Sequence, residues 1–591
     1  MSERPIAIGL FREAVLRFGE GQTATASRLA DRSRELFLLA GDVDGACAAA
    51  LLRGRAALRA ARYPEAAHWL QWARDEAFRR GLVPRVLSAS SELAVLAELQ
   101  GDLLGAVAAH RDVLDQQRQR DDNLGIAMAA GNVARLLPRV AGHTPQIVGE
   151  ARELLADALQ RFRDGPHDAG IANSLICIGD LDRADGKLDD AQRLFQEVIE
   201  MTPTSGVQPM RLLAMHNQGS VLRQMGDYLP AIAAYEAAHA LAVALGEVRS
   251  ARRARTALLM TEAMSGPLDK SLTALVAMGG DLVGSDEDVA KAVLWMNESH
   301  LYAASGQMDV AMWCLKDAHR IFKQRADRVM LDEADLAIAA IALMTSSDRR
   351  AQKQTRRRKS QSVNANRERQ LLRAQVAFRR LDLRDFDETV EALGTAKSWQ
   401  EAVGIGALCV ERAALAGVDN TAGLDPMAEL ALERGARVDY LTLRLAQANA
   451  ALWLGNLQQA EAWSAEVATE AAVLGRPFLD LGARLVYGAA SGNAIDAASW
   501  QKEATRWREF TAIVPAAWCD AFASFVTLDD GLFEEQIKTL HEAGDERSKL
   551  FFFALRAARG PRDIVVLAVQ NFTGAGIFVP PWLTALLEHL H

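Results

Sequence analysis

The chain has 591 residues, half of them apolar and only 6% aromatic, and its formal net charge is −9. Alanine and leucine are frequent, which favours helix because neither side chain loses much conformational freedom there. Over this length the charge is too weak to indicate a global affinity for nucleic acid, and no apolar run reaches the ~20 residues of a membrane-spanning helix.

The N-terminal segment, MSERPIAIGLFREAV, carries charged residues inside its apolar run. A secretory signal keeps its charges ahead of an uninterrupted apolar stretch. We therefore expect a cytoplasmic protein without membrane insertion.

A step of forty residues organises the chain from about residue 10 to 320. It is marked by small residues, which are Ala26, Ala66, Ala106, Ala151, Ala191, Ala231, Ser271 and Ala311. One step is longer, and the extra residues fall in the Pro- and Gly-containing stretch 138–149, which is typical of a loop. Internal repeats of this length are typical of stacked helical hairpins.

Two neighbouring units match at several positions at once. Gly179 and Gly186 return forty residues later as Gly219 and Gly226, and Phe195 returns as Tyr235. A glycine before a new helix supplies the positive φ that ends the preceding helix. The small residue five positions later lets two helices approach closely, and we expect the aromatic residue to fill the space under the next unit.

The stretch 349–369 holds nine Lys or Arg residues and one acidic residue, Glu368. Blocks of like charge are commonly solvated or disordered. We therefore predict that 347–370 is a basic linker or an irregular repeat. The alternative is a docking patch for an acidic protein or for phosphates at Arg356, Arg357, Arg358 and Lys359. The stretch has no aromatic residue for base stacking, which disfavours nucleic acid as the partner.

Units reappear after the basic stretch, and we count about thirteen in all. The predicted organisation is a repeat array over 1–346, the basic segment 347–370, a degenerate array over 371–542 and capping helices over 543–591. The Phe-rich segment KLFFFALRAA is predicted to be core, as a buried helix shows this pattern. The end of the chain, GIFVPPWLTALLEHLH, is predicted to be a Pro-Pro break followed by a short closing helix.

The pattern resembles the tetratricopeptide repeat (TPR) superfamily. The residues that carry the resemblance are Gly179, Gly186, Leu188, Ala191, Phe195, Val198 and Pro203, with Gly219, Gly226, Tyr228, Ala231, Tyr235 and Ala238 in the following unit. The usual unit has ~34 residues, and the step of forty is similar to the long-helix type in kinesin light chains and in the sensor arms of some bacterial regulators. Leu175 stands where the family often has Trp. The resemblance implies an all-α, right-handed solenoid with first helices on the inner wall and second helices outside.

Polar residues of the first helices are the candidate partner-binding residues of the concave face. They are Asn132, Arg135, Asn173, Asp180, Arg183, His216, Asn217, Ser220, Arg223, Asn297 and His300. Arg183 and Arg223 are forty residues apart, so we expect equivalent positions in adjacent units. Two such guanidinium groups suit carboxylates or an extended peptide backbone.

No catalytic pattern is complete. HEAGD, beginning at His541, has Asp545 where a zinc helix needs its second histidine. GIGALC, beginning at Gly404, has Cys409 where a dinucleotide fingerprint needs its third glycine. The five cysteines show no CxxC spacing and are expected to be lone thiols in apolar surroundings. We expect no metal, no cofactor and no enzyme.

The sequence therefore predicts a protein–protein interaction scaffold, or adaptor, that binds a partner protein or peptide in its groove. The alternative is a regulatory receptor arm that senses a peptide or small ligand and controls a separately encoded effector. Binding of a peptide that needs Arg183 and Arg223 favours the scaffold, whereas a thermal shift with a small ligand alone favours the receptor. Self-association stays open.

Overall fold

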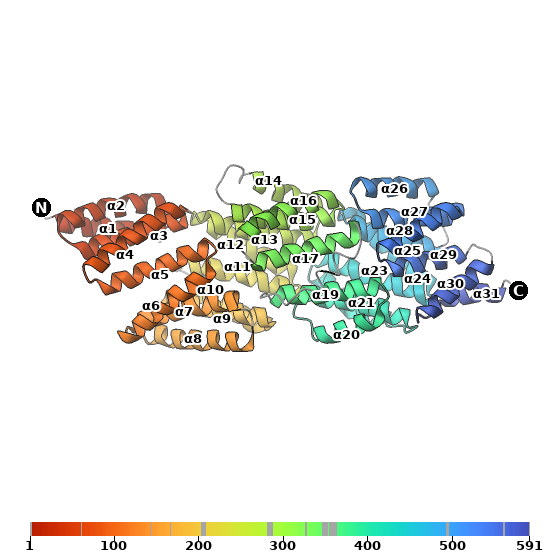
Figure 1. Cartoon of the computed structure of the whole chain (residues 1–591), viewed down its shortest axis with the longest axis horizontal. Helices are drawn as coiled ribbons and strands as arrows, with labels where there is room; N and C mark the ends of the chain where they lie inside the picture. The colour runs from red at the N-terminus through yellow and green to blue at the C-terminus, as the bar shows by residue number, and fades with distance from the viewer. Residues whose placement is uncertain are drawn as a thin grey trace. The chain divides into compact units, whose positions relative to one another are not determined.

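The computed structural model describes residues 3–60, 62–141, 144–165, 167–201, 208–280, 288–324, 328–345, 353, 363–491, 496–558 and 562–589. The regular elements of this described part are helices, and it contains no strand. Figure 1 shows the helices in chain order as a succession of hairpins. The all-α, solenoid-like repeat architecture expected from the sequence is thereby confirmed.

The first half of the chain contributes the helices α1 (Glu3–Gly19), α2 (Thr23–Leu39), α3 (Val43–Arg59), α4 (Tyr63–Arg79), α5 (Val83–Leu99), α6 (Leu103–Gln119), α7 (Asn123–Ala141), α8 (Pro145–Asp164), α9 (Asp168–Asp185), α10 (Leu188–Met201), α11 (Gln208–Met225), α12 (Tyr228–Ala244), α13 (Val248–Ser265), α14 (Leu268–Gly280) and α15 (Asp288–Ala304). In this numbering the odd helices are the first helices of the hairpins. The small residues of the forty-residue step lie on the even helices.

The second half contributes α16 (Met308–Gln324), α17 (Arg328–Thr345), α19 (Val363–Arg379), α20 (Leu383–Leu393), α21 (Trp399–Leu415), the 3-10 helix η1 (Thr421–Leu424), α22 (Asp425–Glu433), α23 (Arg437–Leu454), α24 (Leu457–Val473), α25 (Pro477–Ser491), α26 (Ala497–Glu509), α27 (Ile513–Thr527), α28 (Asp530–Glu542), α29 (Glu546–Ala557), α30 (Arg562–Gly574) and α31 (Pro581–His589). The predicted closing helix after the Pro-Pro break is α31. The last residues of the predicted basic stretch form the first turns of α19, and most of the rest lies outside the described residues.

Two compact units make up the chain. Unit 1 comprises 1–221 and 233–255, and unit 2 comprises 222–232 and 256–591. Within each unit, many helices pack against the next one in sequence, as α1 does with α2 and α24 with α25, and first helices also contact the next first helix, as α7 does with α9 and α21 with α23. This double neighbour pattern is what stacked hairpins produce, because no hairpin buries its apolar face alone.

The repeat spacing is visible in the polar contacts as well. Side chains 37 residues apart join Arg135 to Glu98 and Asn217 to Asp180, and those 38 apart join Asn449 to Glu411. Each pair links one hairpin to the next. Equivalent positions of adjacent units therefore lie next to each other, as the forty-residue step predicts.

Glycine has two separate roles in the hairpins. Gly186 ends α9 in the left-handed region with φ of 81°, which glycine adopts without steric cost. Gly179 instead lies inside α9, where a β-carbon would come within 2.8 Å of the Phe195 ring. The same close approach joins Gly219 to Tyr235, at 2.9 Å. The aromatic ring therefore packs on the first helix of its own hairpin. The sequence pattern predicts a contact with the next unit and does not predict this one.

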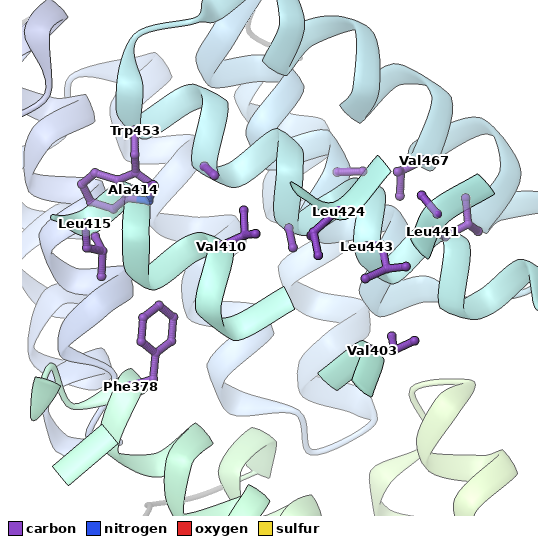
Figure 2. Close-up of a cluster of buried hydrophobic side chains, with 14 of the residues drawn as sticks. Phe378, Val403, Val410, Ala414, Leu415, Leu424, Leu441, Leu443, Trp453 and Val467 are labelled. Atoms are coloured by element: carbon purple, nitrogen blue, oxygen red, sulfur yellow. The ribbon is translucent and has the colours of Figure 1, made fainter. Parts of the chain in front are cut away.

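Two large apolar clusters form the core of unit 2. One surrounds α21 and α23 and includes Trp399, Val410 and Trp453, and Figure 2 shows part of it. The other includes Trp500, Phe522 and Phe552. The predicted core segment 549–558 thus contributes Phe552 to the core, with 2% of its surface exposed.

Unit 2 also folds back on itself through contacts between residues about two hundred positions apart. The Tyr228 hydroxyl donates to Asp439 Oδ2 at 2.8 Å, an oxygen that also accepts, at 2.8 Å, from Nε1 of Trp399, 40 residues before Asp439. Arg434 pairs with Asp227 at 2.9 Å, and Leu268 N donates to Leu474 O at 3.1 Å. These bonds join the start of the unit to its middle.

A second set of long-range contacts attaches the C-terminal segment of unit 2. Phe578 N donates to Leu415 O at 2.8 Å, and Trp582 Nε1 donates to Leu452 O at 3.2 Å. Leu583 of α31 is fully buried in the core cluster around α21 and α23. The segment on both sides of the Pro-Pro break therefore covers the ends of helices well before it in sequence.

Candidate functional site

The predicted concave-face residues lie on α7, α9, α11 and α15, which are all first helices. Eight of them are half-buried: Asn132, Arg135, Asn173, Asp180, Arg183, Ser220, Arg223 and Asn297. His216 and Asn217 are buried, and His300 is exposed. A common role of these residues in binding a partner stays a prediction, and their hydrogen-bond partners within the fold differ from one residue to the next.

Asp180 is the centre of a small polar cluster in unit 1. Asn217 Nδ2 donates to its two oxygens at 3.2 and 3.3 Å, and Arg183 lies 3.5 Å away. Burial raises the pKa of Asp180, while the charges of Arg183 and Arg253 oppose the shift. Arg253 was not among the predicted residues, although it follows Asn217 by nearly one repeat step and that spacing was the available signal.

Several other predicted residues are used within the fold. Arg135 forms two hydrogen bonds to the Glu98 carboxylate, at 2.7 and 2.6 Å. Ser220 Oγ accepts from the Tyr235 hydroxyl at 3.1 Å. Asn297 Nδ2 donates to the Val293 carbonyl in its own helix at 2.8 Å. Arg135 and Ser220 thus join one helix to another, and Asn297 is bonded within its own helix, so less of their hydrogen-bonding capacity is left for a partner.

The predicted arginine pair is divided between the two units, with Arg183 in unit 1 and Arg223 in unit 2. The Arg223 side chain has no ion pair among the described residues, and its carbonyl accepts from Gln400 Nε2 at 3.1 Å. A shared role for the two arginines stays a prediction. The predicted basic patch, Arg356, Arg357, Arg358 and Lys359, lies outside the described residues.

A pocket of about 270 Å³ lies in unit 2. The described residues that line it all belong to first helices, namely α17, α21, α23, α25, α27 and α29. Most of the wall is apolar and aromatic: Met344, Leu445, Trp453, Phe478, Leu485, Val486, Trp518, Phe551 and Phe552. First helices that are far apart in sequence thus enclose a common space.

The polar side of the pocket is built by Glu411, Asn449 and Arg547. Arg547 Nη1 donates to Glu411 Oε2, and Asn449 Nδ2 donates to Glu411 Oε1 at 3.3 Å. Burial raises the pKa of Glu411, and the Arg547 charge and the two hydrogen bonds oppose that shift. The Arg547 guanidinium also lies over the Phe378 ring, 5.2 Å from its centroid, where the electron-rich face attracts a cation.

Asp545 anchors the edge of the pocket. It accepts from Trp518 Nε1 at 3.1 Å and from the Ser548 amide at 3.2 Å, so it caps the start of α29. Arg379 Nε lies 3.6 Å from Oδ1 of Asp545, the oxygen that accepts from the Ser548 amide. The residue that stands in place of a second zinc-binding histidine in HEAGD therefore has a structural role. It fixes the indole of Trp518 and the helix that carries Arg547.

Sequence reasoning did not find this pocket. Its residues are spread from 344 to 552, and its apolar members follow the helical spacing of any buried face. The one local signal was the Phe-rich segment, of which Phe551 and Phe552 line the pocket. The polar signal is a carboxyl and an amide nearly one repeat step apart, at Glu411 and Asn449. A similar spacing joins Asp180 to Asn217 away from the pocket, so it does not identify a binding site.

The cysteine thiols are poor candidates for chemistry. Cys47, Cys177, Cys314 and Cys519 are buried, and Cys409 is half-buried. Burial raises the pKa of Cys47 to about 11 and that of Cys177 to about 12. The thiolate is the nucleophilic form. In the described part of the chain, no group of three or more His, Cys, Asp or Glu residues is placed to hold a metal ion.

In comparisons with known proteins, no family model matches the chain and no curated protein does. The helices of the described ranges include none that is both long and apolar enough to cross a membrane.

Proposed function

We propose that the chain is a non-catalytic binding protein of the scaffold or adaptor type, whose helical repeats hold a partner protein or peptide. The observation that supports the proposal best is the pocket lined by first helices. A cavity with aromatic walls and a few converging polar groups is the usual form of a binding site. Partner segments commonly insert one apolar anchor into such a cavity.

We further propose that the repeats are of the TPR type, forming a right-handed array of about thirteen units in a cytoplasmic protein. The forty-residue step, the left-handed glycine before second helices and the close contact of Gly179 with Phe195 support this assignment. Stacked hairpins of this type present extended surfaces to their partners.

The second candidate function is a regulatory receptor arm that senses a small ligand or peptide and controls an effector encoded separately. The position of the Glu411–Arg547 pair in the pocket favours the receptor function, because these two residues are 136 positions apart and connect α29 to α21. A ligand that contacts this pair would bias the packing of two distant hairpins. Ligands change a conformational equilibrium only through such differential contacts.

Selection of peptides from a random display library on the purified full-length chain tests the scaffold function. Enriched peptides are then measured by isothermal titration calorimetry against three variants. Ala407→Phe narrows the pocket, and Ala402→Phe is its control, since Ala402 lies on the same helix but does not line the pocket. Arg183→Glu/Arg223→Glu reverses the charge of the predicted arginine pair.

We expect at least a tenfold weaker affinity for Ala407→Phe and an unchanged affinity for Ala402→Phe. If only the double arginine variant loses affinity for the peptides, the binding site lies at the predicted concave-face residues and not at the pocket. Failure to enrich any peptide would contradict the scaffold function. The receptor function would then rest on small ligands alone.

A further inference from the structure

The pocket of unit 2 is electrically balanced. Among the described residues that line it, Glu411 and Arg547 are the only two with charged side chains, and they pair with each other. The side chain of Glu411 is 13% exposed and that of Arg547 is 30% exposed. An additional charge in this apolar space would have no counter-charge, and burying an unpaired charge is strongly unfavourable.

The ion pair is also held in place from both sides. Asn449 donates to the Glu411 oxygen that Arg547 does not use, and the guanidinium of Arg547 lies over the Phe378 ring. A carboxylate ligand would have to compete with Glu411 for Arg547. An ammonium ligand would have to compete with Arg547 for Glu411. Either competition leaves one buried charge without its partner.

Some hydrogen-bonding capacity nevertheless remains beside the pair. An amide side chain has one acceptor oxygen and two donor hydrogens. Asn449 uses one hydrogen on Glu411, and its oxygen has no hydrogen-bond partner among the described residues. The Arg547 guanidinium has further N–H groups beyond the one given to Glu411. One acceptor and one or more donors are therefore available to a neutral group such as an amide or a hydroxyl.

The remainder of the pocket suits an apolar body. Trp453 and Phe551 face each other in a tilted arrangement, with ring centroids 6.2 Å apart, and Trp518 is held by its bond to Asp545. A cavity of ~150 Å³ holds a benzene molecule. By that comparison, the volume of about 270 Å³ holds about ten non-hydrogen atoms.

We propose that the pocket binds an uncharged amphiphile of about this size, with one amide or hydroxyl head at Asn449 and the Glu411–Arg547 pair and an apolar body against Trp453, Trp518 and Phe551. This inference rests on the receptor function proposed above and names its class of ligand. Net charge is the property by which the pocket discriminates, because its own charges already cancel.

Four probes of nearly equal length test the inference on the full-length chain at pH 7. They are octanamide, 1-octanol, octanoate and octylammonium, each kept below its aggregation limit and measured by calorimetry and thermal shift. We expect the two neutral probes to bind at least tenfold more tightly than the two charged ones. Ala407→Phe abolishes binding of the neutral probes, and Ala402→Phe does not.

Two further substitutions examine the head-group contacts. Asn449→Ala lowers the affinity for octanamide at least fivefold. Asn456→Ala leaves this affinity unchanged, because Asn456 is not among the residues that line the pocket. Glu411→Gln removes the carboxylate but leaves the Arg547 charge. This variant therefore binds octanoate more tightly than the wild type does, a gain that general loosening of the fold would not produce.

The opposing outcomes are separate. Tighter binding of octanoate or octylammonium than of the neutral probes to the wild type would overturn the inference and leave the pocket as a ligand site. The four probes could also bind equally to the wild type and to Ala407→Phe, or to neither protein. Either result would rule out the pocket as a ligand site and contradict the receptor function. An unchanged affinity of Glu411→Gln for octanoate would contradict the charge-balance argument.

Discussion

At the scale of single residues, Glu298 is a carboxyl group that the fold buries without a cation. Only 6% of its surface is exposed, and no ion pair involves it among the described residues. It lies against the end of α14, where a β-carbon on Gly279 would come within 2.9 Å of its Oε1. Burial raises the pKa of Glu298 to about 7.

The raised pKa makes the stability of unit 2 depend on pH. The protonated carboxyl is the favoured form in the folded state, so its contribution is complete below the ordinary pKa near 4.5 and is lost as the pH rises through about 7. The free energy of unfolding falls by roughly 3 kcal/mol over this window. In Glu298→Gln this part of the fall is absent, which urea titrations at pH 5 and pH 8 measure. Parallel pH profiles of the two proteins would refute the assignment.

His110 shows the opposite behaviour in unit 1. Its ring is completely buried on α6, and burial lowers its pKa to about 4. The neutral ring is therefore part of the folded structure, and acid removes its contribution between about pH 6.5 and pH 4. Between about pH 4.5 and pH 6.5, a rise in pH therefore lowers the contribution of Glu298 to stability and raises that of His110.

At the scale of the helical hairpin, the glycines that end first helices set the turn. Gly186 has a φ of 81°, whereas Gly149 lies inside α8 with no atom within 4 Å of a β-carbon placed on it. Gly186→Ala forces alanine into the left-handed region and lowers the free energy of unfolding by about 1–2 kcal/mol. Gly149→Ala raises it by about 0.5–1 kcal/mol, because alanine is the better helix former. Urea denaturation of the two variants checks the difference in sign, and a loss in both would contradict it.

The hairpin is also the level at which the sequence was most informative. The forty-residue step, the glycine before several second helices and the small residue five positions later are local signals. The structures that they predict are determined by local geometry. Hairpins and neighbour stacking could therefore be predicted. The partners of Arg135 and Ser220 could not, because the choice between solvent, a ligand and the next helix depends on side-chain reach rather than on helical face.

At the scale of the whole molecule, single hydrogen bonds join distant parts of unit 2. Tyr228 and Asp439 are 211 residues apart. No sequence periodicity identifies such a pair, because each of its members conforms to its own local repeat. The pocket has the same origin, since its walls come together only when first helices from α17 to α29 converge. This is why the sequence indicated the architecture but not the site.

Tyr228 and Tyr235 lie on the same helix and allow a matched test of the fold-back contact. The hydroxyl of Tyr228 donates to Asp439 and accepts from Gln400 Nε2 at 2.8 Å, whereas that of Tyr235 reaches Ser220 in the preceding helix. Tyr228→Phe lowers the free energy of unfolding by about 1–3 kcal/mol, because it leaves a buried carboxylate with one donor fewer. Tyr235→Phe costs less, since Ser220 is only half-buried. Urea midpoints measure both, and equal losses would show that the long-range bond adds nothing.

The fold-back contact also restricts how a chain of this kind can change its length. Repeat arrays ordinarily gain or lose whole units by duplication or deletion, because each unit touches only its neighbours. Between Tyr228 and Asp439 the number of hairpins is fixed. One hairpin more or fewer would move the Asp439 carboxylate along the array, away from the Tyr228 hydroxyl that donates a hydrogen bond to it. In this stretch the number of repeats is therefore as much a part of the structure as the identity of its residues.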